Sequence, residues 1–108
     1  MRRTLAVLFA FAVLPACHDR DHNSLLVHNQ GTSTVVVDLT YKVYLDGNSR
    51  HSSSLVSAGT IFEDDLPIVR ELHVVITRVS GGAILFKDDF NHDDFRDDHG
   101  RIEIVVFP

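Results

Sequence analysis

The sequence contains a single cysteine, Cys17, and no tryptophan among its 108 residues. One cysteine cannot form an internal disulfide, nor a structural zinc site, which needs at least two thiolates. Basic residues are also few, with ten Lys and Arg against fifteen Asp and Glu. Because nucleic-acid binding depends on clustered basic side chains, this balance argues against nucleic acid as a partner. The length predicts one small domain.

Long apolar runs are scarce, and the longest lies near the N-terminus. Residues 5–14 form an unbroken apolar run of ten residues behind Arg2 and Arg3. A membrane-spanning helix needs about 20 apolar residues, so this run is too short to span a bilayer. A positive start, a short apolar helix and a small residue are typical of a secretory signal. We therefore expect residues 1–16 to be a helical signal peptide rather than a buried helix, which would show a polar face.

The apolar run ends in the motif Leu14-Pro15-Ala16-Cys17. This motif resembles the lipobox of bacterial lipoproteins, in which Leu and two mostly small residues precede Cys. The resemblance implies that the Cys17 thiol receives a diacylglyceryl group, that the chain is cut before Cys17, and that the new amine is acylated. The alternative is ordinary secretory cleavage after Ala16. That alternative would place Leu14 where a small residue is expected and would leave a lone free thiol.

A lipid-modified Cys17 predicts attachment to a membrane through acyl chains in the cell envelope. In Gram-negative lipoproteins an Asp after the Cys tends to mark retention in the inner membrane. Because His18 follows Cys17 here, the resemblance favours the outer membrane over the inner one. The alternative location is secreted or periplasmic. From Cys17 onward the chain has eight Lys and Arg against fifteen Asp and Glu, a formal net charge of −7.

The chain after Cys17 divides into a tether and a domain. Residues 18–23 contain no apolar side chain, so we expect residues 17–23 to be a lipidated, flexible tether. From residue 24 onward the dominant period of the apolar side chains is two, which predicts strands with one buried face. The expected strands cover residues 24–29, 35–45, 50–56, 60–66, 72–77, 83–87 and 102–107.

This pattern predicts an all-β fold class, a small Ig-like antiparallel β-sandwich of about seven strands. Its predicted core combines the alternating Val and Ile side chains with Phe62, Phe86 and Phe107. One short helical turn is expected within residues 89–96, with Asp89 as its cap. The sandwich architecture by itself does not imply a function.

The most unusual segment is residues 88–100, DDFNHDDFRDDHG, with six Asp and two His. It begins like a calcium-binding loop, D-x-N-x-D, but Gly100 stands where such a loop has its closing Glu. Two hypotheses stay open for residues 88–99: a solvated acidic loop, or a site for Ca²⁺ or another divalent cation. The candidate Ca²⁺ ligands are Asp89, Asn91, Asp93, Asp94 and Asp97, and the candidate Zn²⁺ or Cu²⁺ ligands are His92 and His99.

Sequence motifs of catalysis are missing: there is no G-x-S-x-G elbow, glycine-rich phosphate loop or H-E-x-x-H. His51 and Ser53 share one strand face, but no acid is assigned to them. We therefore expect an envelope lipoprotein with a non-catalytic binding or structural domain. Its partner would be an unknown envelope protein or surface ligand. A cation-binding module and a small secreted hydrolase are the alternatives, the hydrolase being the less favoured.

Overall fold

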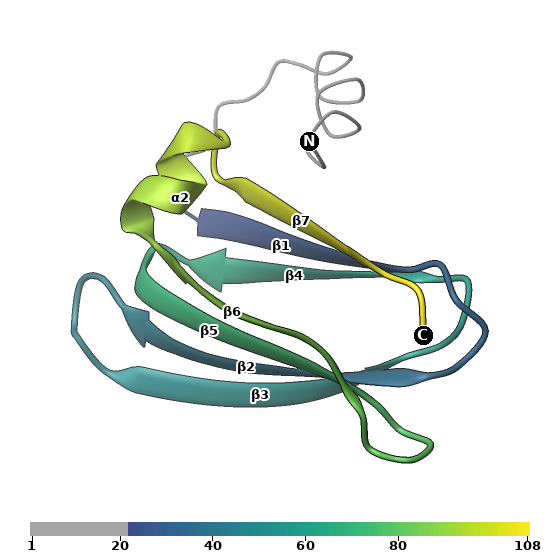
Figure 1. Cartoon of the computed structure of the whole chain (residues 1–108). Helices are drawn as coiled ribbons and strands as arrows, with labels where there is room; N and C mark the ends of the chain where they lie inside the picture. The colour runs from purple at the N-terminus through teal and green to yellow at the C-terminus, as the bar shows by residue number, and fades with distance from the viewer. Residues whose placement is uncertain (1–21) are drawn as a thin grey trace.

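The computed structural model describes residues 22–108, so the predicted signal peptide, residues 1–16, and residues 17–21 of the predicted tether lie outside the described residues. Residues 22 and 23, the end of the predicted tether, belong instead to the first strand, so the domain begins two residues earlier than predicted. The described chain consists almost entirely of strands arranged in two layers (Figure 1). Its elements are β1 (His22–Asn29), β2 (Val35–Val43), β3 (Ser49–Val56), β4 (Ile61–Pro67), β5 (Val69–Arg78), β6 (Ile84–Asn91), α2 (His92–Asp97) and β7 (Arg101–Val106). The prediction of an all-β sandwich of about seven strands is confirmed.

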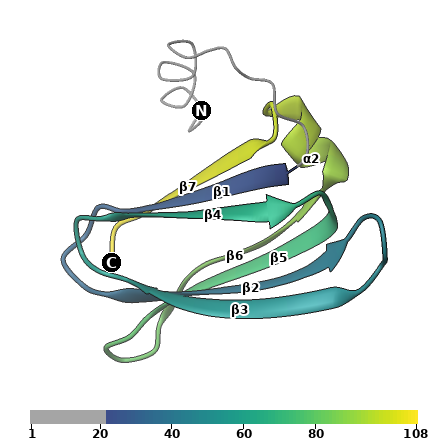
Figure 2. The same ribbon diagram turned by 180° about the vertical axis from the view of Figure 1, so that it is seen from behind.

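The two layers are a three-stranded sheet in the order β4-β1-β7 and a four-stranded sheet in the order β3-β2-β5-β6 (Figures 1 and 2). Four strand pairings are antiparallel, but β1 and β7 run parallel, which differs from the purely antiparallel arrangement predicted. Parallel neighbours cannot be joined by a hairpin and need a long connection. The first and last strands satisfy this condition because most of the domain lies between them.

The core lies between the two sheets and contains the residues that the alternating pattern selects. The buried aliphatic side chains of β2, β5 and β7 are Val35, Val37, Leu39, Val43, Val69, Leu72, Val74, Ile76, Ile102, Ile104 and Val106. Burial of each such side chain stabilises the fold by about 1.5–3 kcal/mol. Strand β2 ends two residues earlier than predicted, at Val43, where its register against β5 shifts, and Leu45 is exposed.

The phenylalanine side chains differ from the predicted core. Phe107 follows the end of β7 and is 70% exposed, so its assignment to the core is wrong. Phe62 and Phe86 are half-buried and pack against the core. Phe90 and Phe95 are buried instead. Phe90 reaches the inner face because β6 continues four residues beyond its predicted end.

One of the two hypotheses for residues 88–99 was a solvated loop, and this prediction is wrong. Residues 88–91 belong to β6, and α2 follows directly. The helix cap is Asn91 rather than Asp89, which lies within β6. Asn91 Oδ1 accepts a hydrogen bond from Asp94 N at 3.0 Å, and Asn91 N donates to Asp94 Oδ2 at 2.8 Å. This capping box and the buried Phe95 hold the short helix against the sandwich.

Candidate functional surface on the four-stranded sheet

The outer face of the four-stranded sheet is not covered by any other described element (Figures 1 and 2), and we call it the open face. Side chains alternate along each strand, so the register aligns its outward residues in four rows that run from β3 to β6. Counted from the end opposite α2, the rows are Leu55, Val36, Thr77 and Ile84; Ser53, Asp38, Val75 and Lys87; His51, Thr40, His73 and Asp89; and Ser49, Lys42, Glu71 and Asn91.

The first row is apolar except for Thr77 on β5. Leu55 and Ile84 at its two ends are 70% and 61% exposed, and Val36 between them is half-buried. Val75 in the second row extends this apolar area. Single exposed apolar residues are ordinary, but a contiguous set on an uncovered sheet face is typical of an interaction surface.

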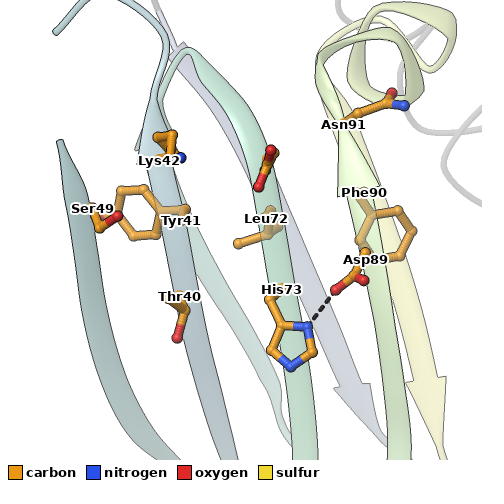
Figure 3. Close-up of a pocket in the computed structure, with 10 residues that line it drawn as sticks. Thr40, Tyr41, Lys42, Ser49, Leu72, His73, Asp89, Phe90 and Asn91 are labelled. Carbon is orange, nitrogen blue, oxygen red and sulfur yellow. Dashed lines mark hydrogen bonds and ion pairs between the residues drawn. The ribbon is translucent and has the colours of Figure 1, made fainter. Parts of the chain in front are cut away.

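Two histidine–aspartate pairs cross between neighbouring strands of the open face. His73 Nδ1 contacts Asp89 Oδ1 between β5 and β6 (Figure 3). His51 Nε2 lies 3.8 Å from Asp38 Oδ1 between β3 and β2. Thr40 lies between the two histidines in the third row. The alternation within β3 predicts the shared face of His51 and Ser53, but it does not predict their contact with Asp38, because strand register is not visible in the local sequence.

Ser53, Asp38 and His51 are close together but do not have the geometry of a catalytic triad. Ser53 Oγ donates a hydrogen bond to Asp38 Oδ1, and His51 approaches the same carboxylate oxygen. In a triad the histidine accepts the hydroxyl proton and the acid orients the histidine from its other side. Here the acid lies between the serine and the histidine, so the cluster can bind a polar group but does not activate Ser53.

A shallow groove with a volume of about 400 Å³ lies in the half of the open face nearer α2 (Figure 3). Its outward lining includes one ammonium group and two carboxylates, together with hydroxyl and amide groups. The lining residues are Thr40, Tyr41, Lys42, Ser49, Glu71, Leu72, His73, Asp89, Phe90 and Asn91. Small-molecule pockets are usually apolar and enclosed. This groove instead brings side chains of both charge signs together above Tyr41, Leu72 and Phe90.

The predicted cation ligands do not converge on one point. The side chains of Asn91 and Asp94 are used in the capping box, and Asp89 contacts a histidine of β5. Asp93 Oδ1 lies 3.0 Å from Arg96 Nη2 on the same helix. Among residues 22–108, no three His, Cys, Asp or Glu side chains converge in a group that could hold a metal ion. The density of acidic residues in the sequence therefore does not correspond to a coordination geometry.

The two histidines proposed as Zn²⁺ or Cu²⁺ ligands are also separated. His92 packs against the ring of Tyr44, with 4.9 Å between the ring centroids. Arg70 lies over the same Tyr44 ring, with its Cζ 5.5 Å from the centroid, and its Nη2 donates to the Tyr44 carbonyl at 3.2 Å. Asp97, the last residue of α2, is exposed, and so is His99, which follows the helix. His92 thus helps to hold the helix against the β2–β3 turn.

Charge is distributed unevenly along the strands. Four segments of the chain meet at the end of the sandwich opposite α2 (Figure 1). They are residues 29–37, 54–62, 76–86 and 104–108. Of the seven Lys and Arg and thirteen Asp and Glu in residues 22–108, these segments contain only Arg78. The domain therefore has an acidic end, which carries α2, and an end that is nearly free of charge.

Comparison with known proteins gives no relative. The chain matches no protein-family model, and no curated protein or solved structure is significantly similar to it. Within residues 22–108, no helix has both the length and the apolar character needed to cross a bilayer. A functional assignment therefore depends on the motif around Cys17 and on the chemistry of the open face.

Proposed function

We propose that this protein is a lipid-anchored lipoprotein of the bacterial cell envelope, with a non-catalytic β-sandwich that binds a neighbour in the envelope. The observation that carries the proposal is the position of the only cysteine. Cys17 directly follows Leu14, Pro15 and Ala16 at the end of a ten-residue apolar run. A buried acyl chain contributes about 0.8 kcal/mol per methylene, and two or more chains give stable attachment. A lone cysteine at any other position would not support this function.

The start of the sandwich supports an anchor close to the domain. Four residues, 18–21, separate Cys17 from His22, where β1 begins. Five residue spacings reach at most about 18 Å even when fully extended. β1 begins at the end of the sandwich that carries α2 (Figure 1). An anchored chain would therefore keep its acidic end toward the membrane and would present its uncharged end and its open face to neighbours.

The open face supports a binding role rather than a purely space-filling one. It combines an apolar row with side chains of both charge signs, and no described element covers it. The open face extends along the strands from the anchored end of the sandwich to its free end. It would therefore face sideways, toward a neighbour in the same membrane.

Metabolic labelling with an alkyne analogue of palmitate, in a bacterial host, tests the anchor. We expect the full chain to incorporate the label and to sediment with membranes, whereas Cys17→Ser should lose both properties. A matched control moves the thiol by one position by adding H18C to the Cys17→Ser chain, which keeps a cysteine but breaks the lipobox spacing. Membrane association that is unchanged in the Cys17→Ser chain contradicts the proposal.

A further inference from the structure

We infer that the open face binds the open face of a second copy of this chain, across a two-fold axis that runs along the strands between β2 and β5. The strand order is β3-β2-β5-β6, so this axis places each β3 against β6 of the second copy and each β2 against its β5. Such a contact uses the same surface twice, so that surface must be complementary to itself. Each of the four rows tests this condition.

The first row is complementary through apolar contact. The axis places Leu55 opposite Ile84 of the second copy and Val36 opposite Thr77 of the second copy. Because the axis repeats both contacts, the two most exposed aliphatic side chains of the open face are covered on both copies. Removal of apolar surface from water contributes about 25 cal/mol per Å².

The third and fourth rows are complementary in charge. In the fourth row, Lys42 lies opposite Glu71 of the second copy, and the axis repeats this pair. In the third row, His51 lies opposite Asp89 of the second copy. Within one chain, His51 and Asp89 are on opposite edges of the sheet, so a pairing between them exists only across the interface.

The second row does not place a carboxylate opposite a carboxylate, a contact that would destabilise a dimer of an acidic protein. Asp38 lies opposite Val75 of the second copy, so no carboxylate meets a carboxylate in any row. Lys87 of the second copy lies opposite Ser53, whose hydroxyl donates to Asp38. The ammonium group of Lys87 from the second copy therefore lies beside the Asp38 carboxylate.

The perpendicular two-fold axis gives a poorer match. It would reverse the order of the rows and place Leu55 opposite Ser49 and Val36 opposite Lys42, so that the apolar row would face the most polar one. The axis along the strands also puts His22 of both copies at the same end of the dimer. Both copies can then be anchored in one membrane, a consequence that rests on the proposed lipid anchor.

The overall charge favours this face over the others. The described residues carry seven Lys and Arg against thirteen Asp and Glu, a net charge of −6. The open face carries two lysines against three carboxylates, so its net charge is only −1. Two copies therefore meet with less electrostatic repulsion here than on faces that carry the remaining acidic groups.

The size of the face predicts a contact that depends on confinement. Four strands about 4.8 Å apart and seven residues at about 3.3 Å each give roughly 450 Å² per copy, or about 900 Å² in total. Specific interfaces usually bury about 1,200 Å² or more, so the dimer should be weak in free solution. Restriction of both copies to one membrane raises their effective concentration, as a tether does.

Cysteine crosslinking in isolated membranes tests the arrangement directly. Leu55 and Ile84 lie on opposite edges of one sheet, about 14 Å apart. A disulfide requires Cα atoms within about 7 Å, so a bond between these positions forms only between two chains. We expect the full chain with Leu55→Cys and Ile84→Cys to give a disulfide dimer on mild oxidation, and either single variant to give little.

The matched control replaces Leu55 by a position of similar exposure on the other sheet. Ile61 is 60% exposed on β4, so Ile61→Cys with Ile84→Cys presents thiols of equal accessibility on different faces. We expect at least a fivefold excess of dimer for the Leu55 and Ile84 pair. Equal crosslinking of the two pairs, no dimer from either, or a product with the mass of a different partner overturns the proposal.

A charge exchange provides a second readout. His51→Glu should reduce crosslinking of the Leu55 and Ile84 pair at least threefold, because two carboxylates then face each other, and Asp89→Lys in the same chain should restore it. Unchanged crosslinking in the His51→Glu chain overturns the proposed axis.

The same variants in a Cys17→Ser chain at high concentration separate the two proposals. If the Cys17→Ser chain forms the crosslinked dimer and the chain with Cys17 does not incorporate the palmitate analogue, only the anchor is refuted. If the chain with Cys17 incorporates the label but shows no specific crosslinking, only the dimer is refuted.

Discussion

Asn29, at the end of β1, offers a quantitative test of how the uncharged end of the sandwich is held together. Its side chain is 1% exposed and forms three hydrogen bonds. Asn29 Nδ2 donates to the Ser33 carbonyl at 2.8 Å and to the Val56 carbonyl at 3.1 Å. Asn29 Oδ1 accepts from Gly31 N at 3.1 Å. One amide therefore joins the β1–β2 connection to the last residue of β3.

The expected cost of Asn29→Ala follows from these three bonds. A buried hydrogen bond contributes about 1 kcal/mol net, and carbonyls left without a partner add to the loss, so the free energy of unfolding should fall by about 3 kcal/mol. This is a large part of the roughly 5–15 kcal/mol that stabilises a typical domain. In a domain of this size it corresponds to a decrease in Tm of more than about 10 °C.

Urea unfolding of the Cys17→Ser chain, followed by circular dichroism, measures this loss. The matched control is Asn23→Ala: Asn23 lies on the same strand and is 3% exposed, but its Nδ2 has no hydrogen-bond partner among the described residues. We expect Asn23→Ala to cost less than half as much. A loss below about 1 kcal/mol for Asn29→Ala, or equal losses for the two variants, would contradict the stabilising role of the three Asn29 hydrogen bonds.

Three further predictions concern other parts of the fold. Phe95→Ala should cost about 3–5 kcal/mol and should expose the backbone of α2 to hydrogen exchange, because Phe95 is the buried residue of that helix; slow exchange in α2 would contradict this. Burial, followed by repulsion from Asp65, raises the pKa of Asp64 above its ordinary value of 3.8. Asp64→Asn should therefore raise Tm at pH 7, and the difference from wild type should vanish below pH 3.8, where the carboxyl is protonated in both states; a lower Tm at pH 7 would count against it. Gly31→Ala should displace the C-terminal segment, because a Cβ there would lie 2.4 Å from Pro108 atoms, and nuclear magnetic resonance shifts confined to other regions would contradict this.

The sandwich was predictable where its pattern is local. In β2 and β5, alternate apolar residues must face the core, and the sequence shows this period without knowledge of any neighbour. The end of β2 was not predictable in the same way. Its alternation continues to Leu45, but a register shift at Val43 ends the pairing first.

Contacts between strands were not predictable, because they join residues far apart in the chain. The pairing of His51 with Asp38 depends on the register of β2 against β3, and that of His73 with Asp89 on the register of β5 against β6. The parallel pairing of β1 with β7 depends on the whole topology. The local alternation specifies none of these pairings. It predicted strands at Asp38, His51 and His73, but it predicted a helix cap at Asp89, which lies within β6.

The acidic segment shows how composition can hide structure. The six Asp residues suggest cation binding, but Phe90 and Phe95 determine the structure, because their burial extends β6 and holds α2 against the sandwich. A usable signal was present in Asn91 and Asp94, three positions apart ahead of an apolar residue, as in a capped helix.

Mass spectrometry of the N-terminal tryptic peptide from isolated membranes tests the proposed modification of Cys17. Trypsin cleaves after Arg20, so a processed and acylated chain should yield residues 17–20 with a diacylglyceryl group on sulfur and an acyl group on the amine. The same peptide without lipid would show ordinary secretory cleavage and would contradict the anchor. A peptide that begins at Thr4 and continues through Cys17 would show that the signal is not removed at all.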